Sequence, residues 1–371
     1  TRIAIRHLRS RHSFGFISFS TIFSIIGLTI GIASLIIISC ISRGFSDMVN
    51  MKLSAIDGHM RISSYISDKI PMKEIQVLDS IIYQFSPDIK STSPYIKKHA
   101  IVKNGLLTEG IIIYGVIESS LDSIFHLHQF TSKLSKFNNE QSIIIGSKLA
   151  KSLNVKIGDN IMIMDIEKIA HEQILHAHNF NIINIFQTDF PEYDRLLAFI
   201  QFDTAEIFFG MDNAASGLIL NLDNPENVDM LESIINQKMD MYPYMITTWK
   251  QRHSSLLEWL TLYDIPIKLI MIFIIAVGIF NTAASLWMII IEKTKDIGIM
   301  KSMGLNDNNI QKIIVKEGAI IGLAGAIGGI VLSSVVLYLQ TTYHFITLSN
   351  DIYFMDYLPV QLDPIYFLFY P

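Results

Sequence analysis

The chain has 371 residues, of which 50% are hydrophobic, and its net charge is −5. This length suits about two or three domains, and the mean hydropathy of +0.38 is high for a soluble protein. No basic stripe interleaved with aromatic side chains indicates nucleic-acid binding, so we expect no nucleic-acid partner.

Three long runs carry no charged residue: 19–42, 269–291 and 319–343. A bilayer core about 30 Å thick requires roughly 20 apolar residues of helix, so each run can cross it. Buried core helices are the alternative, but three such runs would need a very large core to cover them. We predict transmembrane spans at 19–42, 265–291 and 318–343.

The first span follows a basic leader, residues 1–18, which we interpret as a cytoplasmic amphipathic segment. Residues 1–42 contain Arg but no acidic residue, and short basic flanks stay in the cytoplasm. The apolar run is longer than the roughly 7–15 residues of a signal-peptide core. We therefore interpret it as a retained first span and not as a cleaved signal peptide. Cys40 is the single cysteine of the chain and lies in this span, so the outer domain has no disulfide.

Residues 43–264 are predicted to form a large domain outside the cytoplasm. Irregularly alternating β-rich runs and helix-like stretches, such as 71–85 and 227–239, predict an α+β domain rather than a doubly wound sheet. Asp203 is a candidate N-cap for a helix that ends at Phe209. The expected strands are 59–64, 99–102, 110–116, 142–146, 160–164, 180–186, 196–202 and 217–222.

No motif for catalysis or nucleotide binding occurs in the chain, because the phosphate-loop, zinc-protease and nucleophile-elbow patterns are all missing. A solvated loop explains the acidic residues near position 190, which are Asp189, Glu192 and Asp194. The histidines of one loop lack a recognised metal-ligand spacing, so we expect no metal at His171, His176 and His178. The chain is predicted not to be an enzyme.

Residues 292–317 return to the cytoplasm and begin with a distinctive segment, 292–304. It is charged at its start and then amphipathic, and Gly304 can supply a left-handed C-cap. Asn306 or Asp307 can cap the helix that follows. A short helix between two spans is typical of a docking element, and a surface helix without a partner is the alternative. The candidate contact residues are Glu292, Lys293, Lys295, Asp296, Ile297, Met300, Lys301, Met303 and Gly304.

Small residues spaced four apart occur in the first and third spans. Such pairs let transmembrane helices approach closely, although chance in a glycine-tolerant helix is the alternative. Three spans make a poor solitary bundle, so we expect a partner. The pairs are Gly27 with Gly31, Gly318 with Gly322, and Gly325 with Gly329.

An apolar run that starts at Pro364 is too short to span the bilayer, and we interpret 344–371 as an outer loop followed by a truncated fourth span.

The segment EKTKDIGIMKSMG, residues 292–304, resembles the coupling segment of the FtsX/MacB/LolC-LolE permeases. The leader TRIAIRHLRSRHSFGFIS and the stretches GLTIGIASLIIISCISRGF and FPEYDRLLAFIQFDTAEIFFG resemble the LolC/LolE branch. The resemblance covers nearly the whole chain. It implies an α-helical membrane protein with three complete spans, a truncated fourth, and a MacB-like outer domain of two subdomains, with an insertion near 117–194.

The resemblance also implies a function. Such permeases form the membrane subunit of an ABC-type complex in the inner membrane, bind two copies of a separate ATPase, and pair with a second permease, homologous or identical. They pass lipoproteins from the membrane to a periplasmic carrier. The chain itself would bind no cofactor, since ATP and Mg are used by the partner ATPase. The alternatives are an FtsX-like regulator of cell-wall hydrolases and a MacB-like efflux component.

Two groups of residues are expected to contact the cargo and its carrier. A hairpin near 165–179 would dock the carrier, although it lacks the proline of familiar members, which leaves open whether the chain binds carrier or accepts lipoprotein. The docking candidates are Glu167, Ile169, Ile174 and Leu175. Lipoprotein acyl chains and membrane lipid would meet apolar residues at helical spacing near the outer leaflet: Ile37, Ile41, Phe45, Trp259, Tyr263, Ile267 and Met271.

Overall fold

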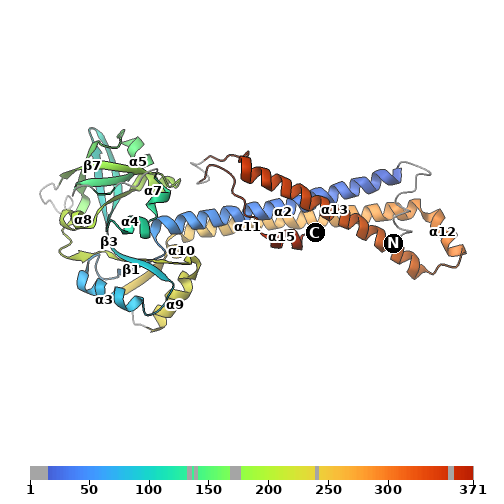
Figure 1. The fold of residues 1–371 in the computed structure, drawn as a ribbon, viewed down its shortest axis with the longest axis horizontal. Helices are drawn as coiled ribbons and strands as arrows, with labels where there is room; N and C mark the ends of the chain where they lie inside the picture. Colours follow the sequence, from blue (N-terminus) through green and yellow to red (C-terminus); the bar gives the residue numbers. More distant parts are fainter. Residues whose placement is uncertain are drawn as a thin grey trace. The chain divides into compact units, whose positions relative to one another are not determined.

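The computed structural model describes residues 16–131, 136–137, 141–167, 177–238, 242–349 and 355–370 (Figure 1). The chain divides into two compact units. Unit 1 comprises the described residues of Thr1–Met48, Glu258–Leu348 and Tyr357–Pro371, and unit 2 comprises those of Val49–Leu257 and Ser349–Asp356. The limits of the outer domain at 43 and 264 remain predictions, because a compact unit does not mark a membrane boundary.

Unit 2 is built on a nine-stranded sheet with the order β11-β1-β10-β3-β4-β8-β5-β7-β6. Every run expected as a strand contains one, and β11 is an additional strand at one end. A small second sheet pairs β2 (Ile70–Pro71) with β9 (Ala214–Ala215). The strands of the large sheet are β1 (Met60–Ser64), β3 (Ile89–Asn104), β4 (Leu107–Val116), β5 (Ser142–Gly146), β6 (Asn160–Asp165), β7 (Ala177–Phe186), β8 (Leu197–Gln201), β10 (Gly217–Leu222) and β11 (Tyr244–Thr248).

Six of the nine strands of this sheet close into a ring. Strand β6 pairs antiparallel with β3 as well as with β7, so β3, β4, β8, β5, β7 and β6 form a ring. Two pairs within the ring are parallel, β4 with β8 and β5 with β7. Closure satisfies the backbone donors and acceptors that a sheet edge would expose. The predicted insertion, 117–194, supplies only β5, β6 and β7 of the ring.

The helices of unit 2 cover the sheet with apolar faces. Helix α3 (Met72–Ile82) buries Ile75, Leu78 and Ile82, and α9 (Val228–Lys238) buries a similar stripe. The proposed N-cap Asp203 is wrong: α8 (Phe202–Phe209) starts after Gln201, and Asp203 lies in its first turn. Burial of Phe202 explains the earlier start. The shorter helices are α4 (Ser120–Ser123), η1 (Leu127–Gln129), α5 (Ser147–Ser152), α7 (Pro191–Leu196), η2 (Pro225–Asn227) and α10 (Trp249–Arg252).

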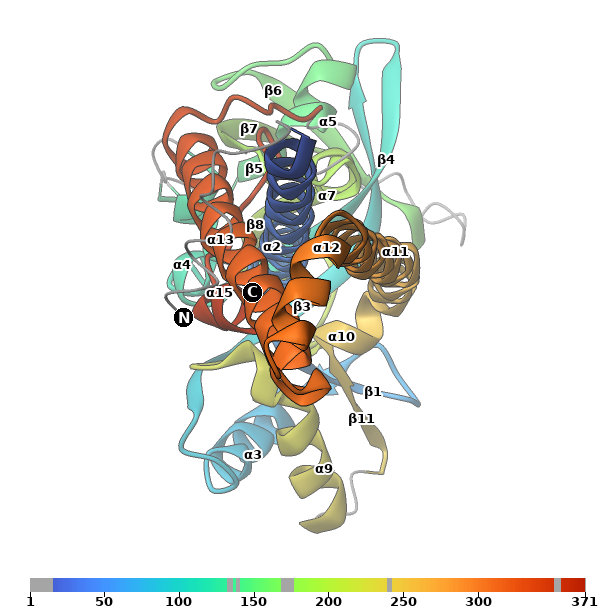
Figure 2. The same cartoon turned by 90° about the vertical axis from the view of Figure 1, so that its right-hand side faces the viewer.

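Among the described residues, three helices are long and apolar enough to cross a membrane: α2 (Phe16–Asp57), α11 (Ser254–Glu292) and α13 (Asp307–Tyr343). Figure 2 views them close to end-on. The prediction of three apolar spans is confirmed at this level, although α2 continues well past residue 42. Pro266 lies inside α11 without ending it. The short helices α12 (Thr294–Ser302) and α15 (Pro364–Phe369) complete unit 1.

Glycines of α13 allow it to pack closely on α2. A Cβ atom at Gly325 would meet the side chain of Leu28 at 2.7 Å, and one at Gly329 would meet Ile32 at 2.7 Å. The Thr29 hydroxyl also donates to the Gly325 carbonyl at 3.4 Å. By contrast, a Cβ atom at Gly322 would meet nothing within 4 Å. The small-residue spacing therefore marks a helix contact at 325 and 329, as predicted, whereas Gly322 makes no such contact.

Candidate functional site

The coupling segment forms its own short helix, α12, between α11 and α13. Lys293 separates α11 from α12, and Gly304 adopts a φ of +90° where α12 ends. This left-handed conformation suits glycine. Asn306 is the N-cap position of α13, although its side chain makes no capping hydrogen bond. The segment therefore has the helix–turn–helix build expected from the sequence.

The two faces of α12 differ from the expected arrangement. Ile297 and Met300 are half-buried and line a narrow cavity with Ile289 of α11 and Ile310 of α13. They pack partly against their own chain, and their expected role as anchors for a partner stays a prediction. The face that remains open carries Ile299 and Met303, which are 53% and 78% exposed. Positions 299 and 303 are one helical turn apart, and this places them on the same side.

The charged residues of the coupling segment are divided between that open face and the inner cavity. Lys295 and Asp296 are exposed. Lys301 pairs with Asp307 at 2.6 Å, which ties the end of α12 to the start of α13. Lys293 lines the inner cavity together with Glu317 of α13, and Glu292 is the last residue of α11. Of the charged residues, Lys295 and Asp296 are therefore best placed to meet another protein.

The predicted lipid-contacting residues fall into two groups in unit 1. Ile37, Ile41 and Phe45 on α2 are partly buried, and Ile37 packs on the cluster around Ile36 and Cys40. On α11, Trp259 and Tyr263 are exposed and their ring centroids lie 4.5 Å apart. Ile267 and Met271 are half-buried, and the Ser39 hydroxyl lies 4.0 Å from the Met271 sulfur.

Only one residue of the carrier-docking group is described. Glu167 follows β6 and pairs with the buried Lys98 of β3 at 2.9 Å; Lys98 also pairs with Asp68. Because β6 and β7 are antiparallel neighbours, Glu167 lies at the base of the connection between them. The remaining candidates lie outside the described residues: Ile169, Ile174 and Leu175.

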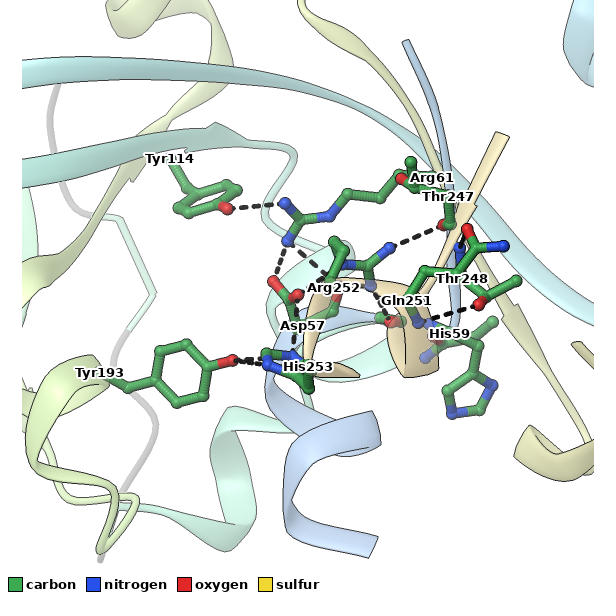
Figure 3. A network of polar contacts seen from close by, with 12 residues as sticks. Asp57, His59, Arg61, Tyr114, Tyr193, Thr247, Thr248, Gln251, Arg252 and His253 are labelled. Carbon is green, nitrogen blue, oxygen red and sulfur yellow. Dashed lines mark hydrogen bonds and ion pairs between the residues drawn. The ribbon is translucent and has the colours of Figure 1, made fainter. Parts of the chain in front are cut away.

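A buried polar network surrounds Asp57, the last residue of α2, in unit 2 (Figure 3). The Asp57 carboxylate pairs with Arg61 of β1 and with Arg252, whose Nε lies 2.6 Å away. The ring of His253 lies 3.3 Å from the same carboxylate. Arg252 also donates to the backbone carbonyls of Asp57 at 3.0 Å and Gly58 at 2.7 Å. These carbonyls belong to the end of α2, where no helical partner exists for them.

Two tyrosines connect this network to the rest of unit 2. The hydroxyl of Tyr114, on β4, accepts a hydrogen bond from Arg61 at 2.8 Å. The hydroxyl of Tyr193, on α7, lies 2.9 Å from Nε2 of His253. The Arg61 guanidinium also lies over the Tyr95 and Tyr114 rings, 5.3 and 5.2 Å from their centroids. The network therefore joins α2, α7, α10 and the sheet.

The charges of the network stabilise one another despite their burial. Burial alone would raise the pKa of Asp57, but Arg61 and Arg252 hold that pKa well below its usual range. Burial, together with nearby His126 and Arg252, lowers the pKa of His59 to about 4. His59 accepts a hydrogen bond from the Leu222 amide at its Nδ1, 2.8 Å away, which requires the neutral ring. Removing one partner of such a buried pair typically costs about 3–5 kcal/mol.

Sequence reasoning missed this network and misread the acidic cluster beside it. Asp194 is buried and accepts hydrogen bonds from the Thr188 amide and hydroxyl, both at 2.8 Å. Asp189 pairs with Lys52 at 2.7 Å. The solvated-loop interpretation is therefore wrong for both, whereas Glu192 is exposed. The available signal was an aspartate at the end of a long apolar helix, with arginines on two separate segments.

Within the described ranges, no group of three or more His, Cys, Asp or Glu side chains is arranged to hold a metal ion. Of the three histidines at which we expected no metal, only His178 is described. The centroid of its ring lies 5.3 Å from that of Phe208. His171 and His176 lie outside the described residues.

Two family matches cover most of the chain. The MacB-like periplasmic core domain family matches residues 21–238, and the FtsX-like permease C-terminal family matches residues 268–370. The chain belongs to the FtsX/MacB permease superfamily. Both matches bear out the resemblance seen in residues 292–304 and in the outer domain.

Relatives within this superfamily match nearly the whole of this chain. A lipoprotein-releasing system transmembrane protein, LolC, of Neisseria meningitidis is 25% identical, with 97% of this chain and 89% of the relative covered. The corresponding LolE of Haemophilus influenzae is 27% identical over the same shares. The periplasmic region of MacB from Actinobacillus actinomycetemcomitans aligns with 55% of this chain and 95% of that chain, at 11% identity and a TM-score of 0.36. The similarity to the LolC/LolE branch rests on the first two.

Proposed function

We propose that this permease is the membrane-spanning subunit of a lipoprotein-releasing ABC-type complex. The observation that carries the proposal is the match to both LolC and LolE proteins over 97% of the chain. Hydrolysis of ATP by a separate subunit would drive extraction of lipoproteins from the inner membrane and their transfer to a periplasmic carrier. The chain itself would bind neither ATP nor Mg.

The open face of α12 is the proposed contact for that ATPase. Ile299 and Met303 would supply apolar contacts, and Lys295 and Asp296 would set the orientation. The inner residues Ile297 and Met300 would seat α12 against α11 and α13, so that a push on α12 moves both helices. Apolar anchors at the centre of an interface commonly dominate its binding energy, whereas charges at the rim contribute less.

Helix α11 is the proposed wall for acyl chains and for a second permease. In the most apolar 18-residue stretch of α11, only 6% is buried inside the chain, whereas 33% is buried in the corresponding stretches of α2 and α13. Its exposed apolar surface therefore needs lipid, cargo or a partner. The aromatic pair Trp259 and Tyr263 suits the membrane interface, and acyl chains contribute about 0.8 kcal/mol per buried CH₂. Photo-crosslinkers at these two positions should capture lipoprotein.

The proposed orientation places the α12 region in the cytoplasm and unit 2 in the periplasm. It can be tested with single cysteines in a Cys40→Ser background. Leu106→Cys lies at a fully exposed turn of unit 2 and should react with an impermeant thiol reagent in intact spheroplasts. Asn306→Cys should react only after the membrane is opened. The reverse pattern would refute this orientation.

Purification of the full chain from its native membrane tests the function itself. The proposal predicts that an ATPase and triacylated lipoprotein are purified with it. Recovery of a cell-wall hydrolase activator in place of lipoprotein would instead support an FtsX-like regulator.

A further inference from the structure

The segment that precedes and forms α7, residues 187–196, is fastened to both helices that leave unit 2. We call it the relay segment. Its Asp189 pairs with Lys52 of α2 at 2.7 Å, and its Tyr193 contacts His253, directly ahead of α11, at 2.9 Å. One contact therefore comes from the end of α2 and the other from the start of α11.

The contact between Lys52 and Asp189 is partly buried. The side chains of Lys52 and Asp189 are 15% and 21% exposed, and shielded pairs are screened less by salt than surface pairs. Asp189 is held at a φ of +68°, a conformation that few residues other than Gly, Asn and Asp adopt readily. Asparagine tolerates the same conformation, so Asp189→Asn can test the charge without changing the backbone.

The other side of the relay segment is fixed to the closed ring of strands. Asp194 accepts hydrogen bonds from Thr188 and, at 3.2 Å, from Ser147 at the start of α5. A Cβ atom at Gly146, the last residue of β5, would lie 2.2 Å from the Asp194 carbonyl oxygen, so the two backbones touch. The segment then continues directly into β8, which pairs with β4 and β5. A shift of α7 must therefore move β5 and β8.

We propose that the relay segment carries displacement of the two helix ends into the ring of strands, with Asp189 and Tyr193 as its positioning residues. The inference rests on the proposed function, because it assumes that ATP hydrolysis moves these helices. The ring includes β6 and β7, whose connection holds the predicted carrier-docking residues. Relative movement of α2 and α11 would thus change the positions of β6 and β7.

The test uses the full chain in its purified complex, with a reporter on β7. Asn179→Cys, at an exposed position, is placed in the Cys40→Ser background, and its maleimide labelling rate is compared between nucleotide-free and ATP-trapped states. Tyr193→Phe removes one hydroxyl, and Asp189→Asn removes one charge while tolerating the positive φ. Arg195→Gln is the matched control, because Arg195 lies on the same helix and makes an exposed pair with Glu109 at 3.3 Å.

We expect the ATP-dependent difference in labelling to fall about fivefold in Tyr193→Phe and in Asp189→Asn, since each loses roughly one hydrogen bond or ion pair. ATP hydrolysis and the melting temperature should stay close to those of the parent, and Arg195→Gln should keep the full difference. Lys52→Met combined with Asp189→Asn should lose no more than either single change, the signature of a shared contact.

An unchanged labelling difference in Tyr193→Phe and Asp189→Asn would overturn the inference, as would a parent complex without any difference. Lipoprotein bound to the purified complex is measured separately. If the labelling difference depends on Tyr193 but no lipoprotein is found, the relay stands and the proposed function fails.

Discussion

Arg252 binds the end of helix α2 at Asp57. Its Nε binds the Asp57 carboxylate at 2.6 Å, and its Nη2 binds the Asp57 backbone carbonyl at 3.0 Å. The residue that follows Arg252 is His253, after which α11 begins. The chain therefore enters unit 2 at the end of α2 and leaves it at the start of α11 beside one buried cluster, in which a single carboxylate binds two guanidinium groups.

Loss of that carboxylate should destabilise the protein strongly. Asp57→Asn leaves Arg61 and Arg252 buried without their counter-charge, and we expect the free energy of unfolding to fall by about 3–5 kcal/mol. Denaturant unfolding of the full chain in detergent measures it. Asp47→Asn is the control, because the Arg43–Asp47 pair on α2 is exposed and should contribute less than about 1 kcal/mol. Equal effects of the two changes would contradict a special role for Asp57.

Acid should weaken unit 2 through His59. The pKa of His59 is lowered to about 4 in the folded chain, whereas an unfolded histidine titrates near 6.5. Between these values the unfolded state binds more protons, so stability falls as the pH falls, by at most about 1.4 kcal/mol per pH unit. The slope between pH 6.5 and 4 should become shallower in His59→Asn and stay unchanged in His99→Asn, an exposed control.

Close packing of α13 on α2 should depend on two glycines and not on a third. Gly325→Ala and Gly329→Ala force a Cβ atom against Leu28 and Ile32, and such overpacking typically costs about 1–3 kcal/mol. Gly322→Ala meets open space and should be neutral or slightly stabilising. Melting temperatures in detergent distinguish the three. A loss of stability in Gly322→Ala as large as in Gly325→Ala would show that helix propensity, rather than contact, decides the outcome.

The open face of α12 should govern ATPase binding. Met303→Asp places a charge at the proposed interface, and we expect it to abolish purification of the ATPase with the chain, since truncating a central anchor commonly costs about 2 kcal/mol or more. Lys301→Ala breaks only an exposed pair with Asp307 and should weaken binding modestly. Unit 2 should remain folded in both variants. Full ATPase recovery with Met303→Asp would remove this face from consideration.

Much of the fold was accessible from the sequence because local patterns determine it. Charge-free runs marked α2, α11 and α13, and β-rich runs marked the strands of unit 2. The inward face of α12 was not predicted, because the pattern Ile297, Met300 and Met303 does not show which side meets the neighbouring helices. The packing of Ile310 against that face decides it.

The Asp57 network was hidden for a different reason. Its members lie at positions 57, 61, 114, 193, 252 and 253, and only the tertiary fold brings them together. Single charged residues on separate segments have no periodicity, so no pattern in the sequence indicated that they meet. The carboxylate of Asp194 was misread in the same way, because its partner Thr188 is recognisable only once α7 is folded.

Release of a lipoprotein from a membrane tests the central claim most directly. The full complex is placed in proteoliposomes with a triacylated lipoprotein, and the soluble lipoprotein–carrier complex is measured after addition of ATP and the periplasmic carrier. We predict release that requires both ATP and the carrier, and that is lost in Met303→Asp. Hydrolysis of ATP without any release of lipoprotein would contradict the account.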